Sequence, residues 1–121
     1  MSGIQMALLG SSGSRPSVVA NSVTGFDSGP AFSGNVSTFG YSPNTTASGG
    51  TPPYTYAWSY ISTSSGNTPT ISSATTQNPY WFATVEDGTP SDSIWRVTVT
   101  DSASATGTYE INVSLTWVDN R

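Results

Sequence analysis

The chain has 121 residues and a mass of 12.6 kDa, which is enough for one domain with a hydrophobic core and too little for two. Charged residues make up only 8 % of it and the net charge is −4, so no basic patch can neutralise phosphates and nucleic acid is excluded as a partner. The sequence contains no Cys, His or Lys, which excludes disulfides, thiolate metal sites and a serine nucleophile activated by His or Lys.

The first sixteen residues differ from the rest. An apolar run from Ile4 to Leu9 is followed by GSSGSRPS, a Gly/Ser-rich hinge with a proline. We therefore expect an N-terminal arm and hinge at residues 1–16 and one domain at residues 17–121. The arm either docks on another surface as a short helix or strand or is a disordered tail, because a helix of this length is marginal alone. Its candidate partner-binding residues are Ile4, Met6, Leu8 and Leu9.

The apolar run does not have the form of an export signal. A secretory signal has a positively charged start and a longer apolar core, and a membrane span is longer still. Neither pattern is present. We expect a protein made in a cytoplasm without a signal peptide, and no membrane partner.

From residue 17 onward, short strand-like runs alternate with turn residues at the spacing typical of a β-sandwich. Serine and threonine form about a third of the chain, and 12 % aromatic residues provide more burial than disordered chains have. The sequence predicts strands at 17–24, 35–39, 44–48, 54–62, 68–72, 80–86, 94–101 and 109–117.

The strand predicted at 54–62 has an aromatic residue at every second position. Successive side chains of a strand point to opposite faces, so one face carries Tyr54, Tyr56, Trp58 and Tyr60. Core packing explains this face, with Trp58 inside and the end tyrosines reaching solvent. A sugar-binding stack would need aromatic residues on the outer face, where Ala57 and Ser59 provide none.

The consecutive residues Tyr80, Trp81 and Phe82 cannot all face one core, because Trp81 points away from its two neighbours in a strand. Large apolar groups outside a core often mark protein contacts. We predict that Trp81, with Ala83 and Val85 on the same face, is an interface residue. The alternative is that a loop or the N-terminal segment covers it.

Three carboxylates lie in the turn EDGTPSD: Glu86, Asp87 and Asp92. Calcium needs several oxygen ligands that converge on one point, which such a turn allows. The Asp-Gly pair is also typical of a solvated turn, and no EF-hand spacing is present. We therefore predict no metal site and no cofactor.

The acidic residues do not indicate an enzyme. Two carboxylates can hydrolyse a glycoside when one of them has a raised pKa. Every acid here lies in a turn, on an outer strand face or near a terminus, and no sequence feature indicates such a shift. We predict a protein without catalytic residues.

The last two predicted strands alternate cleanly between apolar and polar residues. Trp95, Val97 and Val99 share one face of the first strand, and the second has apolar residues at every other position from Tyr109 to Trp117. The short link DSASATG between them allows a hairpin. This pattern predicts an antiparallel pair with one buried side.

The fragments GGTPPYTYAW and WRVTVTDSASATGTYEINVSLTW resemble the bacterial and bacteriophage immunoglobulin-like domains of the PKD type. The resemblance implies an all-β fold, an immunoglobulin-like two-sheet antiparallel sandwich, here with an extended N-terminal arm. It places Trp58 in the core between the sheets and Val97 and Val99 at inner positions of the penultimate strand. The chain departs from the pattern at residues 62–66, where typical PKD modules have an Asp-Gly turn, and at Trp95, where many sandwiches have a tyrosine.

The start of the chain, MSGIQMALLGSSG, resembles small virion proteins of tailed phages, which fold in the host cytoplasm and then build a particle. The resemblance implies a non-enzymatic structural protein of a phage virion, a capsid decoration or tail accessory subunit. Its partners would be other virion structural subunits, in a homo-oligomeric or symmetric assembly, contacted through the arm. The alternative function is a carbohydrate-binding or adhesin module, in which Trp81 or the end tyrosines stack on host-surface glycans.

Overall fold

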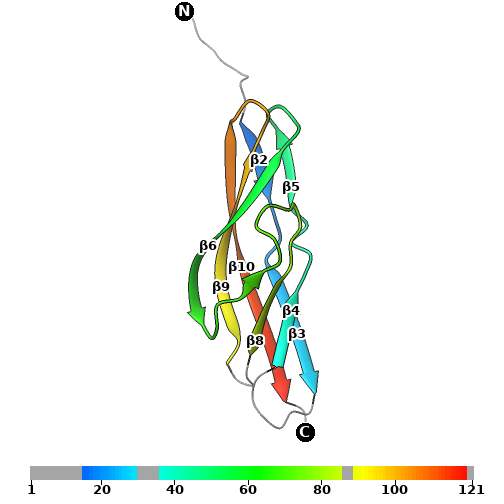
Figure 1. Cartoon of the computed structure of the whole chain (residues 1–121), viewed down its shortest axis with the longest axis vertical. Helices are drawn as coiled ribbons and strands as arrows, with labels where there is room; N and C mark the ends of the chain where they lie inside the picture. The colour runs from blue at the N-terminus through cyan, green and yellow to red at the C-terminus, as the bar shows by residue number, and fades with distance from the viewer. Residues whose placement is uncertain (1–14, 30–35, 86–88, 120–121) are drawn as a thin grey trace, which may run out of the picture.

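A computed structural model describes residues 15–29, 36–85 and 89–119, which form an elongated β-sandwich (Figure 1). In these ranges no helix is long and apolar enough to cross a membrane. The strands are β2 (Pro16–Val19), β3 (Val23–Gly29), β4 (Val36–Gly40), β5 (Thr46–Gly49), β6 (Thr55–Ser65), β7 (Thr70–Ile71), β8 (Trp81–Val85), β9 (Ser91–Thr100) and β10 (Thr106–Asp119).

The first sheet has the strand order β3-β10-β9-β6. Its centre is the antiparallel pair β9 and β10, joined as the predicted hairpin by the short link at residues 101–105. β6 runs antiparallel to β9, and β3 lies parallel to β10 at one edge. The sheet is therefore mixed, with one parallel pairing at its edge.

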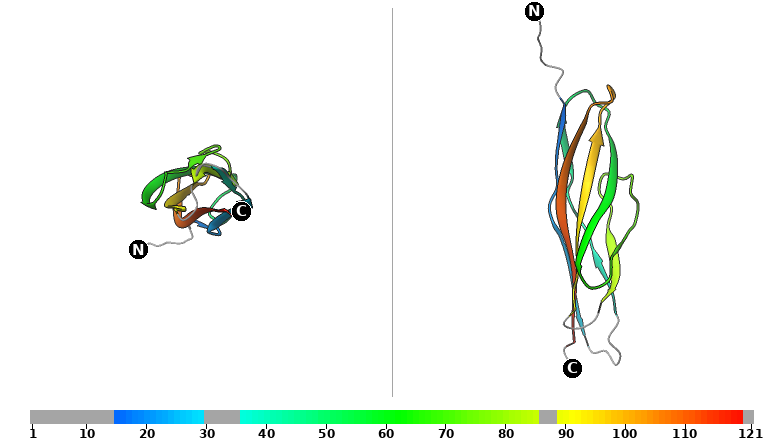
Figure 2. Two further views of the ribbon diagram at one scale, coloured as in Figure 1. Left: turned by 90° about the horizontal axis from the view of Figure 1, so that it is seen from below. Right: turned by 90° about the vertical axis from the view of Figure 1, so that its left-hand side faces the viewer.

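The second layer has two parts. β4, β8 and β7 form an antiparallel sheet in that order, and β2 pairs antiparallel with β5. β4 and β5 follow each other along the chain and are separated at residues 41–45, where Ser42 and Asn44 have φ angles of 66° and 49°. Such angles lie outside the β region, so the strand is interrupted there. The end-on view in Figure 2 shows the strands wrapped around one core.

The packing of these layers confirms the predicted all-β, immunoglobulin-like sandwich. The buried side chains come from both layers and meet in a single cluster. At its centre three tryptophan rings pack edge to face, with 5.2 Å between the ring centroids of Trp58 and Trp81 and 5.8 Å between those of Trp81 and Trp95. Edge-to-face contacts of this kind are favourable beyond the area they bury.

The structure contradicts the prediction that Trp81 is an interface residue. Its side chain is 0 % exposed, and Ala83 and Val85 on the same face are buried too. The physical reason is that this face of β8 points between the two sheets, where Trp58 and Trp95 contact the Trp81 ring. It is the sandwich core itself that covers Trp81, and the neighbours Tyr80 and Phe82 are the residues on the outer face.

The single strand predicted at 17–24 is two strands in different layers. β2 pairs with β5, whereas β3 pairs with β10. The cause is visible in the spacing of the buried residues, because Val18 and Ala20 are two positions apart but Ala20 and Val23 are three apart. The extra residue breaks the period of two, and the chain crosses from one layer to the other at this point.

The predicted strand at 54–62 is confirmed in register. Trp58 is buried, while Thr55, Ala57 and Ser59 are exposed on the other face. β9 begins at Ser91, three residues before its predicted start at 94. Its inward positions there hold small polar residues that hydrogen-bond within the core: Ser91 Oγ donates to the Asn67 carbonyl, and Ser93 Oγ accepts from Trp95 Nε1.

Candidate functional site

The outer face of the β4-β8-β7 sheet carries a cluster of aromatic side chains. The inner positions of β4 and β8 are filled by buried residues such as Thr38 and Trp81, so the alternate positions point outward. We call the four outward rings the aromatic surface: Phe39, Tyr41, Tyr80 and Phe82. Phe39, Tyr41 and Tyr80 are 43 %, 58 % and 39 % exposed, and Phe82 is half-buried.

The four rings contact one another in a closed circuit. Phe39 stacks on Tyr41 with an angle of 14° between the ring planes, and its centroid lies 5.7 Å from that of Phe82. Tyr80 completes the circuit, 5.3 Å from Tyr41 and 6.1 Å from Phe82. Each ring therefore limits the motion of its neighbours. Less side-chain conformational entropy is then lost when a ligand binds.

Hydrogen bonds hold the backbone beneath the aromatic surface. The Tyr80 carbonyl accepts from the Ser72 N–H at 2.8 Å, and the Tyr80 N–H donates to Ser72 Oγ at 3.0 Å. Asn78 Oδ1 accepts from the Thr45 N–H, and Gln77 Nε2 donates to the Thr45 carbonyl, both at 2.7 Å. The bonds to Ser72 tie Tyr80 to the end of β7, and those to Thr45 tie the segment before β8 to the interrupted segment that carries Tyr41.

A polar cleft of about 480 Å³ adjoins the aromatic surface at Phe82. It is lined by Ser37, Asn67, Thr68, Thr70, Phe82, Ala83 and Thr84. Asn67 is fixed in place, because its Nδ2 donates to the Thr84 carbonyl at 2.7 Å and its own carbonyl accepts from Ser91 Oγ at 2.5 Å. The turn before it requires Gly66, whose φ of +70° favours glycine.

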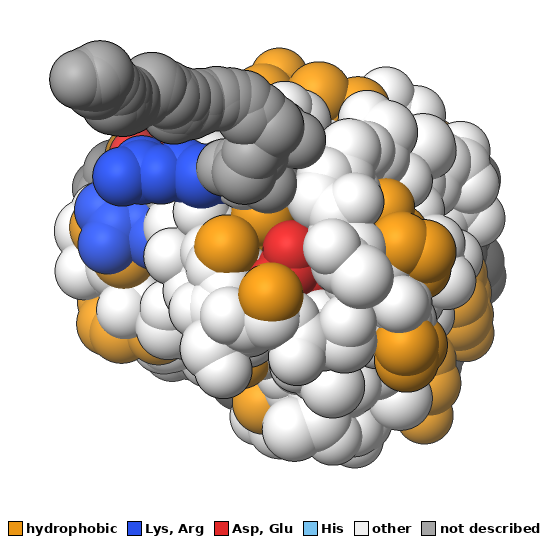
Figure 3. Space-filling model, turned by 90° about the horizontal axis from the view of Figure 1, so that it is seen from above, with side chains coloured by type: hydrophobic (Ala, Val, Ile, Leu, Met, Phe, Trp, Pro, Cys, Tyr) orange, Lys and Arg blue, Asp and Glu red, His pale blue; other side chains and the backbone are white. Residues whose placement is uncertain are grey.

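The described strands β4, β7 and β8 of this sheet carry no charged side chain. The sequence from Ser28 to Val85 contains no Asp, Glu, Lys or Arg, and this stretch supplies β4, β7 and β8. Figure 3 looks onto the end of the molecule at which β2 begins, where the surface is mostly uncharged and polar, with a few charged side chains and hydrophobic side chains in separate patches. The described residues of the site can therefore offer aromatic faces, hydroxyls and amides to a ligand, and no ionic contact.

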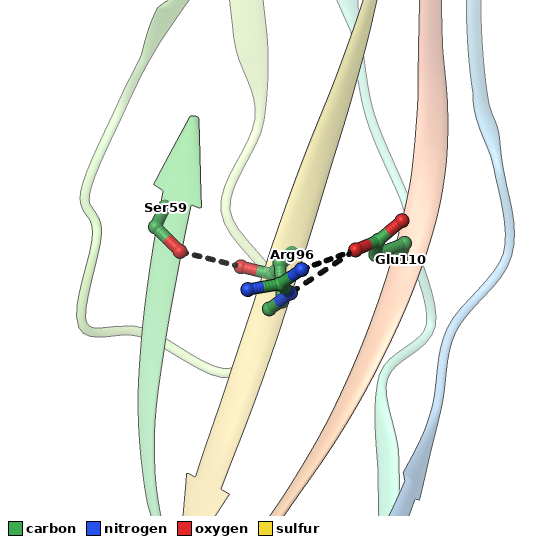
Figure 4. Close-up of polar contacts among 3 residues, drawn as sticks. All are labelled: Ser59, Arg96 and Glu110. Carbon is green, nitrogen blue, oxygen red and sulfur yellow. Dashed lines mark hydrogen bonds and ion pairs between the residues drawn. The ribbon is translucent and has the colours of Figure 1, made fainter. Parts of the chain in front are cut away.

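The charged residues of the described sheets lie on the other layer. Arg96 on β9 and Glu110 on β10 face each other across the strand pair, with Nη2 2.5 Å and Nε 3.1 Å from Glu110 Oε2 (Figure 4). Both side chains are nearly half exposed. An exposed pair of this kind contributes at most about 1 kcal/mol to stability.

A second cleft, of about 350 Å³, lies on the first sheet and contains one carboxylate, that of Asp92. Within residues 15–29, 36–85 and 89–119, no three Asp, Glu, His or Cys side chains gather where they could hold a metal ion. Glu86 and Asp87 of the EDGTPSD turn lie outside those ranges, so the calcium alternative stays untested.

Asp101, the residue after β9, stabilises the turns at this end of the sandwich. Its carboxylate accepts hydrogen bonds from the backbone N–H groups of Thr51, Ala103 and Ala105 at 2.9, 3.0 and 2.9 Å. The bond from Thr51 and those from the other two N–H groups hold the pKa of this carboxyl below its usual range, against the opposing effect of burial. Asp101 thus joins the hairpin link to the turn that precedes β6.

The residues predicted as a site are not those that form the aromatic surface. Trp81 is in the core, and the arm residues Ile4, Met6, Leu8 and Leu9 lie outside the described ranges. The hydroxyls of the end tyrosines bond within the chain, that of Tyr54 to the Gly49 carbonyl and that of Tyr60 to Thr63 Oγ1. The rings of the aromatic surface, which were not predicted as a site, have one signal in the sequence. Aromatic residues stand two positions apart in two segments, Phe39 with Tyr41 and Tyr80 with Phe82.

No family model and no curated protein matches this chain. A solved PKD domain from human KIAA0319 is similar, with 22 % identity, a TM-score of 0.47 and coverage of 93 % of this chain and 92 % of that one. A nucleoside hydrolase-related hypothetical protein from Saccharophagus degradans, associated with carbohydrate metabolism, has 15 % identity, a TM-score of 0.47 and coverage of 89 % and 26 %. The M1 domain from titin has 12 % identity, a TM-score of 0.31 and coverage of 80 % and 92 %. The immunoglobulin-like fold of this chain follows from its own strand order and pairing.

Proposed function

We propose that this chain is a non-enzymatic structural subunit of a phage virion, a capsid decoration or tail accessory protein, that assembles through its N-terminal arm and displays an immunoglobulin-like domain. An immunoglobulin-like sandwich fits a binding or structural module. The finer assignment to a virion comes from the likeness of residues 1–13 to small virion proteins. The proposed partners are other virion subunits in a symmetric or homo-oligomeric assembly, after synthesis in the host cytoplasm.

One observation supports this arrangement above all. β2 begins at one end of the elongated sandwich, whereas β4 and β8, which carry the aromatic surface, lie mainly in the other half (Figure 1). The arm residues precede β2 in the chain. A subunit held at the end where β2 begins would leave the aromatic surface open to a further partner.

Two of the acidic residues whose side chains are described also favour a role without catalysis. The Asp101 carboxylate is used by three backbone N–H groups, and that of Glu110 pairs with Arg96. Neither is positioned as one of two opposed carboxyl groups around a substrate. With no His, Cys or Lys in the chain, other common nucleophile and base pairs are excluded.

Deletion of residues 1–14 tests the proposed attachment. This truncation keeps Pro16, the first residue of β2, so we expect an unchanged melting temperature. Co-expression with virion structural genes from the same genome should yield particles that contain the full chain but lack the truncated chain. A matched control is Gln5→Ala, which changes the arm but keeps its apolar side chains. Normal incorporation of the truncated chain would refute attachment through the arm.

The second candidate function is a carbohydrate-binding or adhesin module. The aromatic surface favours it, because rings on the outer face of a sheet are what a sugar stack requires. The predicted contacts must change, since Trp81 is buried and the end tyrosines bond within the chain. A carbohydrate would instead contact Phe39, Tyr41, Tyr80 and Phe82.

A further inference from the structure

We infer that the aromatic surface and the adjoining polar cleft form a single binding site for a neutral oligosaccharide. The inference rests on the second candidate function and deepens it by naming the class of ligand and the full site, and it does not depend on how the chain is anchored. It rests on four properties of the described residues: the continuity of the surface, the chemistry of its parts, its lack of charge and its rigidity.

The strand register makes the surface continuous. Phe39 pairs with Phe82, which pairs on its other side with Thr70, and Ser37 pairs with Thr84. Aromatic rings therefore cover one part of the outer face and hydroxyls the next, and Phe82 belongs to both. From Tyr41 to Ser37 the chain advances four residues, or about 13 Å in an extended strand. This length suits a short oligosaccharide better than a single ring.

The two parts of the surface match the two sides of a sugar. A pyranose has a face of C–H groups, which packs on an aromatic ring, and a rim of hydroxyls, which needs hydrogen-bond partners. Tyrosine provides an apolar ring and a polar tip together, and Tyr41 is the most exposed ring of the aromatic surface. In the cleft, exposed Ser37, Thr70 and Thr84 hydroxyls and the Asn67 amide supply both donors and acceptors.

The described residues of the site carry no charge, which favours a neutral ligand. Phosphate, sulfate and carboxylate groups are bound in proteins by arginine, lysine or several aligned N–H groups. The stretch from Ser28 to Val85 that builds this sheet contains no charged residue, and Arg96 pairs with Glu110 on the other sheet. An uncharged glycan fits this environment, whereas the charged groups of a sulfated or uronic acid chain would find no ionic partner among these residues.

The composition of the cleft favours a sugar over a protein partner. Protein interfaces have aromatic residues at their centre but are depleted in serine. Here the aromatic rings continue directly into a cleft lined mainly by serine, threonine and asparagine. Neutral carbohydrate is the ligand class that uses both parts at once.

The site is rigid before any ligand arrives. The four rings restrict one another, and both the carbonyl and the N–H of Tyr80 are bonded to Ser72. Asn67 is fixed by bonds to Thr84 and Ser91. Sites built on strands and supported in this way keep their geometry, which weak ligands such as single sugar chains need.

The test is a titration of the full chain with cellohexaose, chitohexaose and mannohexaose in turn, followed by NMR of the aromatic ring resonances. We expect at least one of these neutral sugars to shift the Tyr41 and Tyr80 resonances, and Tyr41→Ala or Phe39→Ala to weaken that binding about tenfold or more. The matched control is Tyr109→Ala, because Tyr109 on β10 is 41 % exposed, close to the 39 % of Tyr80. This control should bind as the wild type does.

Three results would overturn the inference. The first is no ring shift with any of the three sugars at millimolar concentration. The second is a shift that survives in Tyr41→Ala and Phe39→Ala, with melting curves confirming that both variants fold. The third is self-association of the chain that Tyr41→Ala abolishes while no sugar binds, which would reassign the surface to a protein contact. The chain lacking residues 1–14 should bind sugar normally, so failure of the attachment proposal is distinguishable from failure of this one.

Discussion

At the scale of single residues, the three central tryptophans look alike but differ in their indole N–H groups. Trp58 Nε1 donates to the Thr76 carbonyl at 3.0 Å. Trp81 Nε1 is buried and, within the described part of the chain, has no hydrogen-bond partner. A buried donor without a partner costs about 1–3 kcal/mol. The two rings therefore make unequal contributions to stability despite similar packing.

This difference predicts the outcome of two matched substitutions. Trp58→Phe removes ring volume and also a hydrogen bond, whereas Trp81→Phe removes ring volume and an unpaired donor. We expect Trp58→Phe to reduce the free energy of unfolding by about 1 kcal/mol more than Trp81→Phe. Urea denaturation of both variants measures it. A larger loss for Trp81→Phe would contradict the hydrogen-bond assignment.

The Asp101 carboxylate predicts a dependence of stability on pH. Its folded pKa is lowered by the backbone N–H groups that bond to it, first that of Thr51. A lowered folded pKa gives stability that is full above the unfolded pKa, about 3.9, and lost as pH falls through the folded value. Asp101→Asn should therefore melt below the wild type at neutral pH, and the gap should shrink in acid below about pH 4.

Melting curves across that range check the prediction, with Glu110→Gln as the control because its carboxylate is exposed. Glu110→Gln removes an exposed carboxylate, so the comparison shows how much of the effect belongs to the Asp101 turn. A difference for Asp101→Asn that keeps its full size in acid would mean that the carboxylate charge does not stabilise the turn.

At the scale of elements, strands were predictable where alternation was clean and partners were close in sequence. β9 and β10 meet both conditions, so their faces and the hairpin could be predicted. β6 meets only the first, because its partner β9 lies far along the chain, and its faces followed from alternation alone. β2 and β3 were not predictable as two strands. The buried residues Ala20 and Val23 are three positions apart, which breaks the alternation where the chain crosses between layers. The start of β9 was hidden by Ser91 and Ser93, which hydrogen-bond at positions where apolar residues are expected.

The aromatic surface could not be predicted for a related reason. Alternation shows that Trp81 opposes Tyr80 and Phe82 but does not tell which side faces the core. Nor does it bring Phe39 and Tyr41 to Tyr80, because that requires β4 to pair with β8, more than forty residues later in the chain. Which side of β8 faces the core and which strand pairs with it are set only in the folded sandwich. There the largest ring of this segment, that of Trp81, packs between Trp58 and Trp95.

The close approach of β3 and β4 allows a prediction at this scale. A Cβ added at Gly25 would collide with the backbone carbonyl of Phe39, which cannot move without distorting β4. One added at Gly40 would lie 2.6 Å from Val23 Cγ1 and 2.8 Å from Leu115 Cδ2, both side-chain atoms. We expect Gly25→Ala to lose about 1–3 kcal/mol of stability and Gly40→Ala to lose less. Chemical denaturation compares them, and the reverse order would contradict the packing.

At the scale of the whole molecule, the charged pair and the aromatic surface lie on different layers. The Arg96–Glu110 pair lies on the first sheet, and the aromatic surface lies on the uncharged second layer. The end at which β2 begins lies away from β4 and β8, which carry the aromatic surface (Figure 1). One chain can therefore be held by one end and contact an uncharged ligand through one side.

The central claim is that contact is made by the outward rings of the β8 segment, while its inward ring holds the sandwich together. The most direct measurement compares Trp81→Ala with Tyr80→Ala, recording for each the free energy of unfolding and the affinity for the oligosaccharide that shifts the wild-type rings. We expect Trp81→Ala to lose about 3–5 kcal/mol of stability. Tyr80→Ala should stay within about 1 kcal/mol of the wild type and lose binding about tenfold. Tyr80→Ala that binds normally, or Trp81→Ala that melts like the wild type, would contradict the account.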